Sequence, residues 1–262
     1  MPLLIDPASD DITVDHTNMV DRVITAMRSE TEPLRLEDYA EIGGLSPYYF
    51  NRIFKSVIGI PPGEFATSLR FERAKHLLLT TSASVTDICF EVGYGSLGTF
   101  SSRFKHLVGV TPATFRNLPD AVADLDFSKP IFNIDPRQTH IRGRIEGTMS
   151  FPFEYEPSVF IGIFPDVIAV SNPIVGRMIP EPGPFELPHI PYGRWVLLAA
   201  AVPQVSDPIE HLLPAQQLLV ASAGPFVVQP GDEVIRQDLE FRVPHPMEPP
   251  VVTALPALLM QG

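Results

Sequence analysis

The sequence contains a single cysteine, Cys89, in 262 residues, so no intramolecular disulfide can form. The fold therefore does not depend on an oxidising compartment. No apolar run reaches the roughly 18 residues that a membrane-spanning helix needs. The start of the chain also lacks the basic region and long apolar stretch of a signal peptide. These absences predict a cytoplasmic protein that does not enter a membrane, with Cys89 packed in a core rather than acting as a redox sensor.

Motifs of common enzymes are also missing. There is no Gly-x-Ser-x-Gly elbow, no phosphate-binding glycine loop and no pair of carboxylates framed by a plausible pocket. His245 and Glu248 imitate a zinc spacing, but only 14 residues follow Glu248, and a zinc peptidase needs a further distant ligand there. Tyr155, Tyr192 and Trp195 are candidates for a pocket lining, although core aromatics explain them more simply. We therefore expect no enzyme activity, no catalytic residue, no metal site and no cofactor.

An internal repeat at an offset of 50 residues organises the first half of the chain. The repeated positions are Ser46, Phe50, Phe54, Lys55, Gly59, Pro62 and Phe65, matched by Ser96, Phe100, Phe104, Lys105, Gly109, Pro112 and Phe115. So many coincidences at one offset indicate a repeat. A shorter helical pattern and a glycine turn precede each copy, at residues 36–44 and 85–93. The sequence therefore predicts two similar units, each with a short helix and a glycine turn before a second helix.

The first copy, residues 46–55, predicts an amphipathic recognition helix. Ser46 suits its N-cap and Pro47 its first turn. Apolar residues at spacings of three and four share one side: Phe50, Ile53, Phe54 and Val57. The opposite side carries the first ridge, made of Tyr48, Asn51, Arg52 and Lys55. Such a ridge suits a helix in the major groove of DNA, although an ordinary amphipathic helix with a solvated face is the alternative for this stretch alone.

The second copy has a weaker ridge. Adding 50 to each number gives the second ridge, made of Gly98, Ser101, Ser102 and Lys105. Only Lys105 is charged, while Thr99 and Arg103 flank the ridge and are placed to reach a phosphate. This copy is therefore expected to position the protein on DNA rather than to read bases.

These residues resemble the AraC/XylS family of transcription regulators over roughly residues 17–117. The most specific blocks are residues 70–79 (RFERAKHLLL), 85–94 (VTDICFEVGY) and the stretch from Phe104-Lys105 through Gly109-Val-Thr-Pro112 to Arg116. The resemblance implies an all-α domain of two helix-turn-helix units joined by a long helix, with double-stranded DNA and RNA polymerase as partners. The chain departs from the family at Ser102, where arginine is common.

Side-chain chemistry then assigns roles within the expected domain. Arg52 suits guanine and Asn51 suits adenine by bidentate hydrogen bonding, with Tyr48 as the third base reader. Lys55, Lys105 and Arg103 are expected to hold phosphates. Residues 65–79 are expected to form the connecting helix. Its expected core face is Phe65, Leu69, Ala74, Leu77 and Leu78, and its expected surface cations are Arg70, Arg73 and Lys75.

Charge is unevenly spread along the chain. The formal net charge is −12, which is unusual for a DNA-binding protein. Residues 45–116, however, include eight basic and four acidic residues, a local surplus of 4 positive charges. Affinity for DNA depends on the charge that faces the phosphates and not on the sum over the molecule. The acidic remainder is expected to weaken nonspecific binding.

Proline changes the character of the second half, because 21 of the 29 prolines lie from Pro130 onward. Long helices are not expected there. The pattern predicts short strands between proline turns, at residues 139–146, 158–164, 173–179, 185–190, 194–202, 216–222 and 233–243. The last one alternates apolar and polar residues, as a strand with one buried and one solvated face does. The expected fold class is α + β multidomain: an all-α double helix-turn-helix domain followed by an all-β immunoglobulin- or transthyretin-like sandwich.

Residues 183–199 also resemble the Gly-x-Phe-x-Leu … Pro-x-Gly-x-aromatic core of carboxypeptidase-regulatory-like domains, which have a transthyretin fold. Residues 141–145 fit the opening strand of such domains. This resemblance covers roughly residues 137–245. It differs from the common arrangement of the regulator family, in which the DNA-binding domain comes last.

The expected organisation is a mobile leader (1–16), the DNA-binding domain (17–117), a linker (118–136) and the β-sandwich (137–262) as a sensory or interaction domain. The expected function is a sequence-specific DNA-binding transcription regulator whose first recognition helix reads most of the bases. The alternative is a protein-interaction module, the sandwich, merely tethered to DNA by the helix-turn-helix domain. The sandwich would form a homodimer, bind a partner protein or take a small-molecule effector that the residues do not identify.

Overall fold

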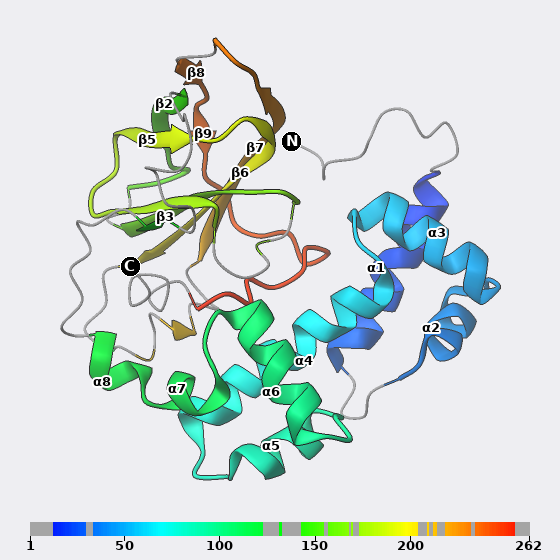
Figure 1. Ribbon diagram of the computed structural model, residues 1–262. Helices are drawn as coiled ribbons and strands as arrows, with labels where there is room; N and C mark the ends of the chain where they lie inside the picture. The colour runs from blue at the N-terminus through cyan, green and yellow to red at the C-terminus, as the bar shows by residue number, and fades with distance from the viewer. Residues whose placement is uncertain are drawn as a thin grey trace. The chain divides into compact units, whose positions relative to one another are not determined.

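The computed structural model describes residues 13–29, 34–122, 131–132, 143–154, 157–167, 169, 173–203, 209, 212–213, 218–231 and 234–254. The chain divides into two compact units. The helical unit comprises Met1–Phe100 with His245–Val251, and the β-containing unit comprises Ser101–Pro244 with Val252–Gly262. Figure 1 shows the helices and the sheets. Among the described residues, no helix is long and apolar enough to cross a membrane.

The helical unit consists of helices joined by tight turns. They are α1 (Val14–Ser29), α2 (Leu36–Gly43), α3 (Pro47–Ile58), α4 (Pro62–Thr80), α5 (Val85–Glu91) and the start of α6 (Leu97–Val108). The apolar stripe of α1 is buried, namely Met19, Val20, Val23, Ile24 and Met27. α1 begins at Val14, so residues 14–16 of the expected leader are helical. Residues 1–12 lie outside the described part of the chain.

The repeat corresponds to two helix-turn-helix pairs, α2–α3 and α5–α6 (Figure 1). Both recognition helices bury the phenylalanines of the repeat: Phe50, Phe54, Phe100 and Phe104. α3 and α6 are each followed by a glycine in the left-handed region, with φ of 91° at Gly59 and 98° at Gly109. A side chain there would be strained, which explains why both copies carry glycine at this position. The predicted helix-turn-helix organisation is confirmed.

α4 is the predicted connecting helix, and its core face differs in part from the expected one. Phe65, Ala74 and Leu78 are buried as expected, together with Phe71, whereas Leu69 and Leu77 are only partly buried. Lys75 is buried, with 3% of its surface exposed. The expectation that this lysine lies at the surface is wrong: Lys75 is buried, and its Nζ donates to Val251 O at 3.2 Å.

The β-containing unit adds α7 (Pro112–Arg116), α8 (Leu118–Val122) and two sheets to the rest of α6. Its strands are β1 (Ile131–Phe132), β2 (Gly143–Ser150), β3 (Pro157–Phe164), β4 (Val175–Ile179), β5 (Pro184–Ile190), β6 (Gly193–Pro203), β7 (Leu219–Val228), β8 (Val234–Arg236) and β9 (Leu239–Glu240). The first sheet has the order β1-β4-β3-β6-β7, and the second has the order β5-β2-β8, with β9 also pairing with β2. α8 and β1 fall within the expected linker.

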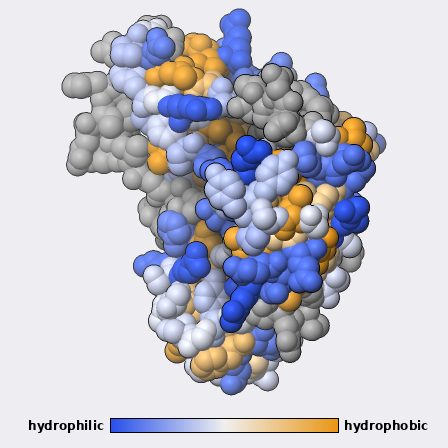
Figure 2. Space-filling view, turned by 90° about the vertical axis from the view of Figure 1, so that its right-hand side faces the viewer, coloured by the Kyte–Doolittle hydropathy of each residue, from blue (hydrophilic) through white to orange (hydrophobic). Residues whose placement is uncertain are grey.

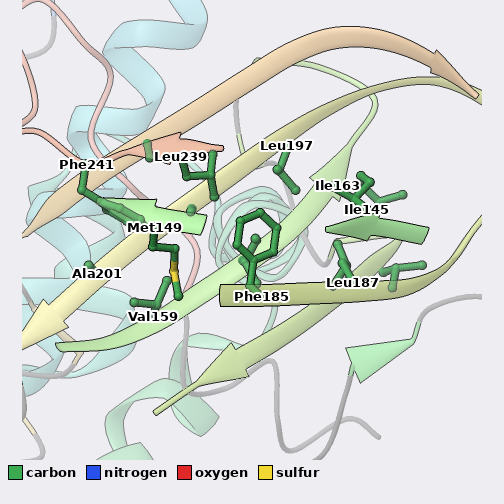
Figure 3. Packing of buried hydrophobic residues seen from close by; sticks show 14 of the residues in the cluster. Ile145, Met149, Val159, Ile163, Phe185, Leu187, Leu197, Ala201, Leu239 and Phe241 are labelled. Atoms are coloured by element: carbon green, nitrogen blue, oxygen red, sulfur yellow. The ribbon is translucent and has the colours of Figure 1, made fainter. Parts of the chain in front are cut away.

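The two sheets share one hydrophobic core. Side chains of β2, β5 and β9 from the second sheet meet side chains of β3, β4, β6 and β7 from the first. Figure 3 shows Phe185 in the middle of this cluster, with Val159, Ile163 and Leu197 among the surrounding residues. All of β3 is buried, so the first sheet is covered on both faces along this strand. That burial explains why β3 reads as a continuous apolar run rather than as an alternating one.

Every predicted strand overlaps an observed strand, and the last one differs most. Residues 233–243 divide into β8 and β9, both of which pair with β2 in parallel. Leu239 and Phe241 are buried as the alternation predicts, but Val243 is 66% exposed. Gln237 and Asp238, between the two strands, hydrogen-bond to β2 instead: Gln237 N donates to Glu146 O, and Asp238 Oδ1 accepts from Thr148 N.

The C-terminal segment, residues 245–251, groups with the helices and not with the strands. Arg28 of α1 donates to Pro246 O at 3.2 Å and to Glu248 O at 3.0 Å. Met247 is buried, with 3% of its surface exposed. The next residues return to the β-containing unit, where Ala254 N donates to Val108 O at 3.0 Å and Thr253 Oγ1 donates to Ala169 O at 2.9 Å.

Candidate nucleic-acid interface

The first ridge lies on the solvent side of α3. Tyr48 is 83% exposed, Arg52 and Lys55 are also exposed, and Asn51 is partly buried. Phe50, Ile53, Phe54 and Val57 are buried on the other side of the same helix. Helical spacing therefore separates the ridge from the core, as the sequence predicts. Ser46 occupies the N-cap position, but its hydroxyl makes no cap hydrogen bond there.

The side chains around the first ridge include a contact that the sequence did not suggest. The guanidinium carbon of Arg52 lies 5.1 Å from the centre of the Tyr49 ring. Tyr49 is partly buried and lies beside α1, where its hydroxyl is 3.5 Å from His16 Nε2. Tyr49 lies outside the i, i+3, i+4 series that defines the ridge. In the sequence, this contact could have been expected only because an aromatic residue stands one helical turn before an arginine.

The second ridge is exposed over most of its length. Gly98, Ser102 and Lys105 are exposed, and Ser101 is partly buried. The flanking residues Thr99 and Arg103 are exposed as well. The ridge thus presents small hydroxyl side chains and glycine with a single lysine, whereas the first ridge presents an aromatic ring, an amide and a guanidinium. The two ridges therefore differ in the side-chain chemistry that they present to solvent.

Cations on α4 are fewer at the surface than expected. Arg73 is exposed and its Nη2 lies 3.1 Å from Glu91 Oε1 of α5, a pair in which both side chains are about two-fifths exposed. Lys75 is buried, and burial lowers its pKa from 10.5 to about 8, an effect that the Glu72 carboxylate opposes. Arg70 is partly buried. Two cations of α3, Arg52 and Lys55, are therefore exposed, whereas on α4 only Arg73 is.

The structure also describes the surroundings of Cys89, Trp195 and Tyr192. Cys89 is buried, which raises the pKa of its thiol, and its Sγ lies 3.7 Å from Tyr94 O. Trp195 Nε1 donates to Pro191 O at 2.8 Å while its ring packs on the β core, whereas Tyr192 is 45% exposed. Tyr155 lies outside the described residues.

The pair with zinc-like spacing, His245 and Glu248, forms its own turn. His245 N donates to Glu248 Oε2 at 3.1 Å, and His245 Nδ1 accepts from Met247 N at 3.2 Å. No group of three or more potential metal ligands occurs among the described residues. The hydrogen bonds of this turn hold the C-terminal segment in the conformation that contacts α1.

Hydrophilic residues dominate the surface near the first helices. Figure 2 turns the side of Figure 1 that carries α1, α2 and α3 toward the viewer. Hydrophobic residues reach the described part of this face only in separate patches. A mostly polar face is compatible with DNA, whose grooves offer hydrogen-bonding base edges and whose backbone is charged.

Comparison with known proteins places the helical part of the chain among transcription regulators. A family model described as a helix-turn-helix domain matches residues 39–118. The HTH-type transcriptional activator AarP of Providencia stuartii is 31% identical over 100 residues, which cover 38% of this chain and 74% of that protein. The bifunctional transcriptional activator/DNA repair enzyme AdaA of Bacillus subtilis is 39% identical over 88 residues, which cover 34% of this chain and 42% of AdaA.

One solved structure is similar to part of this chain. The AraC-type DNA-binding domain protein from Chromobacterium violaceum is 29% identical, and the match covers 40% of this chain and 95% of that one, with a TM-score of 0.37. The family match ends at residue 118, so it does not include the β-sheets.

Proposed function

The chain belongs to the AraC family of helix-turn-helix transcription regulators, and from this membership we propose that it recognises promoter DNA mainly through α3. One observation carries the proposal: Tyr48, Arg52 and Lys55 are exposed and Asn51 is partly exposed, on the side of α3 that faces away from the buried phenylalanines. A helix that stands on a firm core and exposes an aromatic ring, an amide and a guanidinium can enter the major groove.

We assign base reading to the first ridge. A guanidinium pairs bidentately with O6 and N7 of guanine, and an asparagine amide pairs with N6 and N7 of adenine. Arg52 and Asn51 have these groups, and the exposed ring of Tyr48 can contact a thymine methyl or a sugar. Lys55 lies one turn further along α3 and is assigned to phosphate.

The second ridge is proposed to fix position and affinity. Lys105 and the flanking Arg103 are exposed cations, and Thr99, Ser101 and Ser102 supply hydroxyl groups. Contacts of these kinds to phosphate hold a protein in register without reading sequence. The two halves of a binding site should therefore differ in information content, with the strongly specified half under α3.

Selection of bound sequences from a random DNA library tests this assignment. Arg52→Ala is expected to relax preference at one base-pair position, where a bidentate contact discriminates by roughly 1–3 kcal/mol. Lys105→Ala is expected to weaken all sequences alike and to reduce the salt dependence of binding by about one phosphate contact. Arg103→Ala is the matched control on α6. If Arg103→Ala erased preference in one half-site while Arg52→Ala left the motif intact, the roles of α3 and α6 would be reversed.

We further propose that the domain boundaries include the C-terminal segment. The DNA-binding domain would comprise residues 14–117 together with residues 245–251, which contact α1 and α4. The β-sheets would form a sandwich of the transthyretin or carboxypeptidase-regulatory type, a proposal that their shared core and the motif at residues 183–199 support. Its proposed role is sensory or in protein interaction, including homodimerisation.

The rest of the proposed function follows from DNA as the ligand. Because the proposed ligand is promoter DNA, we propose that the protein acts in the cytoplasm. Its proposed protein partner is RNA polymerase, which a regulator must influence. The proposal includes no enzymatic step, since AarP is named as a transcriptional activator and the match to the bifunctional AdaA covers 42% of that protein. Gel-shift competition with random DNA distinguishes this function from a protein-interaction module tethered to DNA, which would show no preference above the salt-dependent background.

A further inference from the structure

The guanidinium of Arg52 lies close to an aromatic ring, that of Tyr49. Its guanidinium carbon lies 5.1 Å from the centre of the Tyr49 ring, within the distance at which a cation is attracted to an aromatic face. An exposed arginine on a helix otherwise samples many rotamers, and a guanidinium that stacks on a ring loses less freedom when it binds. The contact therefore restricts the side chain that is assigned to read guanine.

The Tyr49 ring is held in turn by α1. Its hydroxyl lies 3.5 Å from His16 Nε2, and the two rings meet edge to face with 6.1 Å between their centres. The His16 ring is fixed as well, because its Nδ1 accepts from Thr13 N at 3.3 Å while His16 N donates to Thr13 Oγ1 at 3.3 Å. With Nδ1 accepting, the ring proton of a neutral His16 lies on Nε2, which can then donate to the Tyr49 hydroxyl.

These contacts form a chain from the start of α1 to the proposed base reader. We propose that Tyr49 is a positioning residue for Arg52, which sets how strongly α3 discriminates at the base pair that Arg52 reads. The proposal rests on the assignment of base reading to Arg52. The ring of Tyr49 serves as the platform, and His16 keeps that platform in place from the side of α1. Tyr49 itself need not touch DNA.

Three variants of the full chain separate the platform from a general structural role. Tyr49→Leu removes the ring and Tyr49→Met is a second non-aromatic variant in case the first does not fold. Tyr49→Phe is the matched control, because it keeps the ring and loses only the hydroxyl. The measurement is affinity for a site selected by the wild type and for the same site mutated at the pair that Arg52→Ala relaxes, at two salt concentrations.

The non-aromatic variants are expected to lower the ratio of these two affinities by roughly two- to five-fold, the range that an exposed cation–π contact supplies. Tyr49→Phe should keep most of the ratio. In an Arg52→Ala background, Tyr49→Leu should change the ratio no further, because the group that it positions is absent. The salt dependence of binding should stay constant across the series, because no phosphate contact is lost.

Failure of the inference and failure of the proposed function give different results. If Arg52→Ala changes the preference but neither non-aromatic variant does, Tyr49 is not a positioning residue and Arg52 remains a base reader. If Tyr49→Leu weakens all sequences alike, or acts equally strongly without Arg52, its role is structural and the inference is overturned. If Arg52→Ala itself leaves the preference unchanged, the assigned base reader is wrong and the inference fails with it.

Discussion

At the scale of single residues, Lys75 shows how a covering segment changes what a side chain can do. On α4 alone it is a surface cation, but in the folded chain 3% of it is exposed and its Nζ donates to Val251 O. Burial lowers its pKa from 10.5 to about 8. A charge held in such a place costs free energy even when hydrogen-bonded, and well-packed apolar replacements are often neutral or stabilising.

Lys75→Met is therefore expected to raise the free energy of unfolding at pH 7. Between pH 8 and 10.5 the unfolded chain binds more protons at this position than the folded chain, so the stability of the wild type rises with pH across that window. Below pH 8 the full free-energy cost of burying the ammonium is present in the wild type, about 3 kcal/mol. Lys75→Met removes this cost but also loses the hydrogen bond of Lys75, which offsets about 1 kcal/mol of the gain.

Urea unfolding of both proteins at pH 7, 9 and 10 checks this. The advantage of Lys75→Met should shrink as the pH rises. Lys75→Arg is the opposing control, because it keeps the charge and is expected to destabilise at every pH. A Met variant that is less stable than the wild type at pH 7 would contradict the account of Lys75.

At the scale of elements, the pairing of β3 with β4 depends on two glycines. Gly162 and Gly176 are opposite each other in the register, and Pro173 packs over both. A Cβ built on Gly162 would lie 2.7 Å from Pro173 Cβ, and one built on Gly176 would lie 2.6 Å from Pro173 Cγ. The proline ring thus occupies the space that side chains would otherwise fill.

Gly162→Ala is expected to destabilise the protein by about 1–3 kcal/mol, the cost of overpacking a core. Gly63→Ala, in the first turn of α4, is the control, because an added Cβ there meets nothing within 4 Å. That change should stabilise by about 0.5–1 kcal/mol through helix propensity. Thermal unfolding measures both, and a neutral Gly162→Ala would show that Pro173 can move aside.

The positions of the helices and strands could be predicted from the sequence more closely than the contacts between residues that are distant in the chain. Helical spacing, the repeated glycines and the apolar run of β3 are local patterns, and the helix-turn-helix units and strand positions were predicted from them. The burial of Lys75 and the contact between Tyr49 and His16 could not be predicted in this way, because each depends on residues that are distant in the chain. Division of the last predicted strand into β8 and β9 likewise depends on β2, whose paired residues lie 90 positions earlier.

At the scale of the whole molecule, the charges are segregated. The net charge of −12 coexists with a surplus of 4 basic charges in residues 45–116. Long-range repulsion between the acidic remainder and DNA falls off within a Debye length, about 8 Å at physiological salt, whereas the contacts of α3 and α6 act at close range. We therefore expect the acidic remainder to weaken nonspecific binding while the contacts of α3 and α6 are retained.

The C-terminal segment gives the whole-molecule prediction. A chain that ends after Pro244 loses the carbonyl partners of Arg28 and Lys75 and the buried side chain of Met247, whereas a chain that ends after Ala254 keeps all of them. Burial of one methionine contributes about 1.5–3 kcal/mol. The first truncation is therefore expected to lower the unfolding temperature of the helical unit and, with it, the fraction able to bind DNA.

The second truncation is expected to match the full chain in both respects, because the contacts that hold residues 245–254 are retained. Full-chain Arg28→Ala should fall between the two, since it removes two hydrogen bonds to Pro246 O and Glu248 O but leaves Met247 buried. Thermal unfolding followed by helix content, together with DNA affinity at 25 °C, ranks the three proteins. If both truncated chains unfolded at the same temperature, residues 245–254 would be dispensable to the DNA-binding domain, and its proposed boundary would return to residues 14–117 alone.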